Sequence, residues 1–153
     1  MIEVRVFIES TWRGPAKRDG VAMWLVECMK DGVPVTRQGF VHVKNGTETQ
    51  GNLMALINVF FLLKKSCSAL VFTKCERVLH TLQNQWHVQW EKNGWKNAKG
   101  KPIKEAELWE MLMEKAEPHV YTLRDGWHEY QNLMQSAVQK ELEAWKEKGD
   151  GDG

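Results

Sequence analysis

WHVQWEKNGWKNAKGKPIKEAELW, residues 86–109, combines spaced tryptophans with a run of lysines. Trp86 and Trp90 are four residues apart, which places both rings on one face of a predicted helix. Ammonium groups displace counterions from a phosphate backbone while indole rings hold the segment in place, so the stretch favours contact with nucleic acid. The same pattern is also typical of a helix-loop-helix with its tryptophans in the core and its lysines in solvent. Between positions 92 and 104 there is no acidic residue, and the lysines are Lys92, Lys96, Lys99, Lys101 and Lys104.

The composition predicts one globular domain. The chain has 153 residues, 42% of them hydrophobic, which is enough for a single core. We expect residues 1–148 to form this domain and residues 149–153, GDGDG, to be a disordered tail. The formal net charge is +1, so affinity for nucleic acid has to come from local segregation of charge.

Cysteine usage and hydropathy predict a cytoplasmic protein. The three cysteines, Cys28, Cys67 and Cys75, form no CxxC pair and lie in apolar or helical contexts, which favours reduced thiols. The first residues, MIEVRVFIE, alternate polar and apolar side chains and do not resemble a signal peptide. The longest apolar run, LMALINVFFLL, is too short to span a bilayer.

The order of predicted elements indicates an α/β fold. Alternating residues predict a strand over 2–9, and the Asp31-Gly32 turn predicts an antiparallel hairpin of strands 20–29 and 33–43. Thr47 can cap a helix that runs to Lys65, and the strand at 68–73 that follows it should be parallel to the first. Further elements are predicted as helices over 75–83 and 104–116, a strand over 119–123 and a helix over 128–148.

Residues 86–109 resemble the basic handle of bacterial type 1 ribonuclease H. The matching features are the spaced tryptophans, Trp95-Lys96, the Lys101-Pro102-Ile103-Lys104 turn and Leu108-Trp109, with Glu105 where the family has Asn. The resemblance implies an α/β ribonuclease H-like fold: a mixed five-stranded sheet, three antiparallel strands and then two parallel ones, with helices on both faces. It also implies nucleic-acid contacts from Trp86, Trp90, Lys92, Trp95, Lys96, Lys99, Lys101 and Lys104. We expect Trp86, Trp90, Trp95 and Trp109 to pack in the core as well.

The family hydrolyses the RNA strand of RNA/DNA hybrids with two divalent ions held by four acidic residues. Two hard cations close together need several anionic oxygens to offset their repulsion. By resemblance, VFIEST, GNLMA, VFTKCERV and HEYQNLMQSAV align with the four acidic segments. They place Glu9, Asn52, Lys74 and Gln135 at the acidic positions. One carboxylate of four is retained, and an ammonium at Lys74 would repel a metal ion.

These substitutions predict a site without metal. We expect Glu9 and Lys74 to lie side by side near the ends of adjacent parallel strands, within reach of a direct or water-bridged ion pair. The competing outcome is that Lys74 turns out to solvent and leaves Glu9 free. We expect no cofactor, with Mg²⁺ or Mn²⁺ needed only by an active enzyme. Asp125 aligns near the family's loop histidine, and His128 could take that place only with a shifted loop.

Three functions remain open from the sequence. The preferred one is a domain that binds RNA/DNA hybrid or duplex nucleic acid without cutting it. The second is an active ribonuclease H with displaced acids, for which Glu9, Glu48, Asp125 and Glu129 are candidates. The third is a protein-interaction domain that keeps only the fold. We expect a monomer with nucleic acid as its partner, no membrane association, and leave a protein partner open.

Overall fold

The computed structural model describes the backbone of residues 1–152 and the side chains of residues 1–149. The predicted disordered tail, residues 149–153, lies almost entirely outside the residues whose side chains are described and stays a prediction. The elements are β1 (Ile2–Ser10), β2 (Arg18–Lys30), β3 (Val33–Gly46), α1 (Glu48–Leu62), β4 (Cys67–Phe72), α2 (Glu76–Gln83), α3 (Trp86–Lys92), α4 (Ala106–Ala116), β5 (Val120–Arg124) and α5 (Gln131–Asp152).

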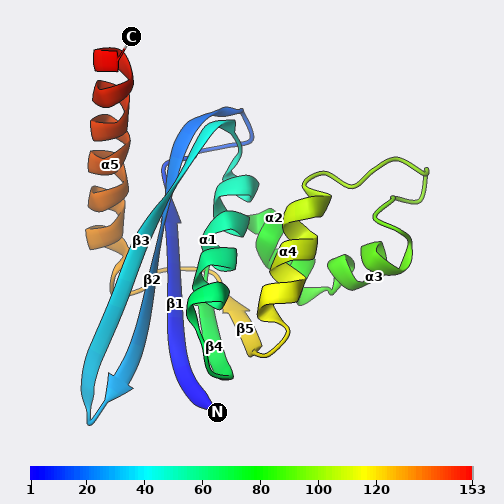
Figure 1. The fold of residues 1–153 in the computed structure, drawn as a ribbon, viewed down its shortest axis with the longest axis horizontal. Coiled ribbons are helices and arrows are strands. Elements are labelled where there is room, and N and C mark those ends of the chain that lie inside the picture. Colours follow the sequence, from blue (N-terminus) through cyan, green and yellow to red (C-terminus); the bar gives the residue numbers. More distant parts are fainter. Residues whose placement is uncertain (153) are drawn as a thin grey trace.

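The strands form one sheet in the order β3-β2-β1-β4-β5. β1 pairs antiparallel with β2, and β2 with β3, whereas β4 pairs parallel with both β1 and β5. This confirms the predicted mixed sheet. Figure 1 shows α5 on one face of the sheet and α1, α2 and α4 on the other, so the prediction of helices on both faces is also confirmed.

The central strand β1 contributes to a core on each face of the sheet. Val4, Val6 and Ile8 pack into the cluster under α1, whereas Phe7 packs with Met134 and Val138 of α5. Because successive side chains of a strand point to opposite faces, alternate residues of β1 serve the two cores. Near its end β1 carries a polar residue, Glu9, which is 3% exposed.

Several predicted helix ends differ from the structure. α1 ends at Leu62 and not at Lys65, because Leu63 takes an extended conformation that turns the chain toward β4. α4 begins at Ala106 and not at residue 104, because Glu105 has a left-handed backbone with φ 56°. α5 begins at Gln131 and not at His128, which stays in the preceding loop.

The loop of residues 11–17 is anchored by a buried tryptophan, which sequence analysis treated only as part of a turn-rich basic segment. Trp12 is 1% exposed, and its indole nitrogen donates to the Gly46 carbonyl at 3.0 Å. Gly20 and Gly51 make room for the ring, since a Cβ atom would lie 2.4 Å and 2.5 Å from it. This packing holds the neighbouring Arg13 beside the end of β1.

No helix in the described part of the chain has both the length and the apolar character to cross a membrane.

Candidate functional site

Glu9 and Lys74 meet where β1 and β4 end. The parallel register pairs Phe7 of β1 with Phe72 of β4. Glu9 and Lys74, each two residues further along, therefore lie at the same level. The Lys74 ammonium donates a hydrogen bond to Glu9 Oε2. The predicted ion pair is therefore confirmed. The Glu9 side chain is 1% exposed and the Lys74 side chain 39%, so the carboxylate lies beneath the ammonium.

Two further donors reach the Glu9 carboxylate from the last part of the chain. Gln135 of α5 donates from Nε2 to Glu9 Oε1. His128 Nε2 lies 2.7 Å from Glu9 Oε2, and its Nδ1 accepts from the Tyr130 backbone N–H at 3.2 Å. Because Nδ1 is an acceptor, the neutral ring carries its proton on Nε2 and donates it to Glu9. Burial lowers the pKa of His128, which favours this neutral form.

The side-chain amide of Asn52 forms its hydrogen bonds with other residues of the protein. Its Oδ1 accepts from Thr73 Oγ1 at 2.7 Å, and its Nδ2 donates to the Glu48 carbonyl at 3.0 Å. Asn52 lines a cavity of about 30 Å³ that Glu9, Lys74 and Gln135 also line. The structure thus brings the four positions together, around a space with room for one or two water molecules.

These residues do not fit a pair of divalent cations. Glu9 is the one carboxylate among the four positions, and both its oxygens already accept hydrogen bonds. A metal ion would lie against the Lys74 ammonium, which it repels. In the part of the chain that the structure describes, no three histidine, cysteine, aspartate or glutamate side chains are grouped to hold a metal ion.

His128 and Arg13 also belong to the site. Sequence analysis gave His128 this place only with a shifted loop, and it did not assign Arg13 to the site. We expected Asp125 near the family's loop histidine, but Asp125 is exposed and accepts from the Gly126 N–H, whereas His128 reaches Glu9. Arg13 donates to Gln135 Oε1 and to the Ser10 carbonyl at 2.7 Å. Gly126, directly after Asp125, has φ 103°, a conformation that glycine adopts readily, and the loop beyond it brings His128 to Glu9.

Of the three other candidate acids, only Glu48 lies at the cavity. Burial raises the pKa of the Glu48 carboxyl, which lines the cavity beside Glu9. Glu129 instead forms an ion pair with Arg5. Arg5 lies four residues before Glu9 on β1, which is roughly 13 Å from Glu9 along the strand. Asp125 and Glu129 are absent from the residues that line the cavity.

A groove of about 1120 Å³ runs between the site and the start of α4. Its charged lining residues are balanced in sign, so the groove by itself is not strongly basic. The cations are Lys17, Lys74, Arg77 and Lys104, and the carboxylates are Glu48, Glu76, Glu105 and Glu107. The positive charge next to it comes from the lysines of the handle, residues 86–109.

The handle is held to the core by three of its four expected core tryptophans. Trp109 is fully buried, Trp90 packs edge-on against it at 5.8 Å, and Trp95 is half-buried. Trp86 is 41% exposed, so the expectation that it packs in the core is wrong. α3 is only seven residues long, and Trp86 is its first residue.

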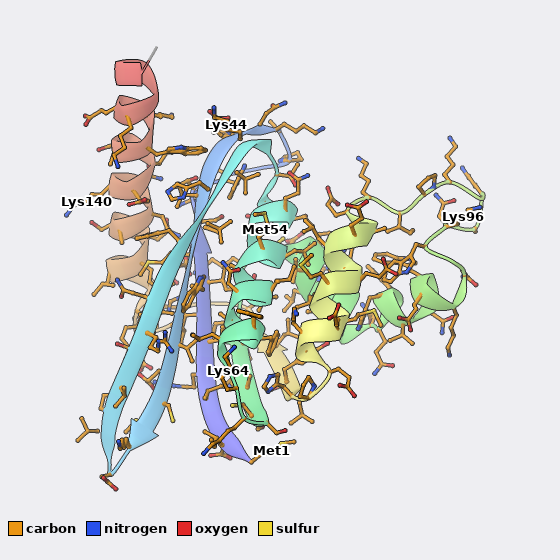
Figure 2. All side chains as sticks on the ribbon, viewed as in Figure 1. Met1, Lys44, Met54, Lys64, Lys96 and Lys140 are labelled. Carbon is orange, nitrogen blue, oxygen red and sulfur yellow. The ribbon has the colours of Figure 1, made fainter. Side chains whose placement is uncertain are left out.

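The lysines of the handle all face solvent. Lys92, Lys96, Lys99, Lys101 and Lys104 are exposed, and none forms an ion pair with a described residue. Asn97 closes the turn, since its Oδ1 accepts from the backbone N–H groups of Lys99 and Lys101. Figure 2 shows Lys96 on this projecting loop, on the opposite side of the molecule from α5.

Sequence comparison finds similarity to bacterial ribonucleases H over part of the chain. The chain is 37% identical over 76 residues to ribonuclease H of Pseudomonas putida strain W619, which covers 50% of this chain and 51% of that protein. The chain spans about half the length of the curated relatives it matches. No family model matches the sequence.

Solved structures match over most of the chain. LC9-RNase H1, a type 1 RNase H with the type 2 active-site motif, superposes with a TM-score of 0.72 at 19% identity, over 91% of this chain and 73% of that one. The foamy viral protease-reverse transcriptase in complex with RNA/DNA hybrid superposes with a TM-score of 0.70 at 14% identity, over 92% of this chain and 20% of that one. The fold is therefore that of the ribonuclease H-like α/β domains. In sequence, the chain is similar to ribonuclease H over about half of its length.

Proposed function

We propose that this domain binds RNA/DNA hybrid or duplex nucleic acid through its handle and the adjoining groove, and does not hydrolyse it. The carrying observation is the Lys74 ammonium on Glu9, in the groove beside a handle whose five lysines are exposed. The viral structural neighbour in complex with RNA/DNA hybrid supports hybrid as a ligand. The lysines would release counterions from the phosphate backbone, without reading the base sequence.

Loss of hydrolysis follows from the chemistry of the four positions. Two-metal hydrolysis needs carboxylates to hold both ions on either side of the reacting phosphate. This chain offers Glu9, already bonded to three donors, and the nearby Glu48, whose carboxyl has a raised pKa. Glu48 is the feature that most favours the alternative of an active enzyme with displaced acids.

Handle binding is tested by the salt dependence of affinity for a labelled RNA/DNA hybrid. Replacing Lys92, Lys96, Lys99 and Lys101 with Gln should lower the slope of log affinity against log salt by about 0.9 for each lysine that touches a phosphate. The matched control replaces Lys64, Lys65, Lys140 and Lys146, which are lysines outside the handle. An unchanged slope in the handle variant, or an equal decrease in the control, would refute handle binding and favour the protein-interaction alternative.

Hydrolysis is tested on the same hybrid with Mg²⁺ or Mn²⁺. We expect binding without cleavage in both ions. Cleavage that requires metal and disappears in Glu9→Gln and Glu48→Gln would establish the active alternative.

A further inference from the structure

Lys74 stands at the junction of the small cavity and the large groove. It lines both spaces, as does Glu48, and it is the one cation that the two lining sets share. Its side chain is 39% exposed, whereas the Glu9 side chain beneath it is 1% exposed. The ion pair is therefore oriented, with the Lys74 ammonium toward the groove and the Glu9 carboxylate toward the protein interior.

The Lys74 ammonium keeps donor capacity for a ligand. An ammonium group has three N–H donors, and the described residues take one of them, through Glu9 Oε2. The other two donors have no acceptor among the described residues, and the Lys74 side chain is 39% exposed. A phosphate oxygen in the groove is the kind of acceptor that forms short, charge-assisted hydrogen bonds with such a group.

The negative charge of Glu9 is shielded from the groove. Gln135 and His128 donate to the same carboxylate, and Arg13 donates to the far end of Gln135. A phosphate that enters the groove therefore meets the ammonium before it meets the carboxylate. The arrangement suits an anion on its outer side, where the family's acidic positions would hold cations.

We propose that Lys74 is a phosphate-binding residue that contacts the nucleic-acid backbone directly and without metal, at the position where the family's ions would lie. This inference rests on the proposed function, because it assumes that nucleic acid enters the groove. It assigns Lys74 more than a structural role as counter-ion of Glu9. The expected signature is a phosphate contact that survives removal of divalent ions.

The test measures hybrid affinity across a salt series in EDTA, for the unmodified chain and for Lys74→Met. Removing one phosphate contact should lower the slope of log affinity against log salt by about 0.9. Between about 50 and 200 mM salt, the affinity of the unmodified chain should therefore fall about 3.5-fold more than that of Lys74→Met. Lys140→Met, on the exposed surface of α5, is the matched control and should leave the slope unchanged. A slope for Lys74→Met equal to that of the unmodified chain would overturn the inference.

Variants of Glu9 separate phosphate contact from structural support. Glu9→Gln removes the opposing charge but keeps Lys74, so hybrid binding should tighten and the slope should not fall. Glu9→Gln with Lys74→Met removes both charges, which should restore any thermal stability that the single variant lacks while the slope stays about 0.9 lower. Recovery of the full slope in this double variant would show that Lys74 acts only through Glu9 and would overturn the inference.

The outcomes also separate this inference from the proposed function. If the unmodified chain binds hybrid and the handle variant lowers the slope but Lys74→Met does not, only the role of Lys74 fails. If the unmodified chain does not bind hybrid in EDTA at any salt concentration, the inference about Lys74 fails, even if the chain binds hybrid once metal is added.

Discussion

Trp109→Ala tests whether the handle depends on the core of the domain. Trp109 of α4 is fully buried. Its ring packs edge-on against Trp90 of α3, with centroids 5.8 Å apart, and lies 6.5 Å from His87 of the same helix. Removing the indole would therefore leave a cavity between α4 and α3 and loosen the attachment of the handle.

The expected cost comes from two opposing effects. A buried aromatic side chain removes roughly 150–250 Å² from water, which at about 25 cal/mol per Å² corresponds to about 4–6 kcal/mol. Among the described residues the Trp109 indole N–H has no hydrogen-bond partner, so its removal recovers about 1–3 kcal/mol of desolvation. We expect a net loss of about 3 kcal/mol, at the lower end of the usual range for Trp→Ala in a core.

Chemical denaturation measures this loss, with Trp127→Ala as the matched control. Trp127 is 70% exposed, so the same change of residue type should alter the free energy of unfolding by less than about 0.5 kcal/mol. The midpoint of thermal unfolding should fall by roughly 6–12 °C for Trp109→Ala. Amide exchange should speed up in α3 more than in β1. A loss under about 1 kcal/mol, or an equal loss in both variants, would refute the assigned packing.

Two further predictions concern protons and metal. Burial lowers the folded-state pKa of His87 and His128 from the usual 6.5, so the unfolded chain takes up protons that the folded chain does not, and the free energy of unfolding should fall as the pH drops below about 6.5. Chemical denaturation between about pH 7.5 and 5.5 checks this, and the free energy of unfolding of His87→Asn should fall less over that range. A free energy of unfolding that rises toward the acidic end would contradict the prediction. Calorimetric titration with Mn²⁺ should show no micromolar site in the unmodified chain and a new one after acids are restored. The restored variant is Asn52→Glu, Lys74→Asp and Gln135→Asp, and a micromolar site in the unmodified chain that Glu9→Gln abolishes would refute the account of the site.

The amino-acid sequence determined the order and type of the elements, because their signals are local. Alternation of apolar residues in β1 and the cap at Thr47 act over a few neighbouring residues. The lysine run of the handle is visible for the same reason. The pairing of Glu9 with Lys74 could also be predicted, because the resemblance aligned both residues with acidic positions at strand ends and parallel neighbours bring their ends together.

Other contacts were decided only by the tertiary structure. The His128–Glu9 bond joins residues 119 positions apart, and it depends on how Met134 and Val138 seat α5 against Phe7. A histidine in a loop has no periodic pattern that would reveal such a contact.

Exposure within the handle and the site likewise depends on packing. Trp86 resembles Trp90 in sequence, yet Trp90 packs against Trp109 of α4 whereas Trp86, the first residue of α3, is 41% exposed. Trp12 lies in a loop of polar appearance and is buried because Gly20 and Gly51 make room for its ring. These outcomes follow from the shapes that distant segments present to each other, which no local pattern in the chain encodes.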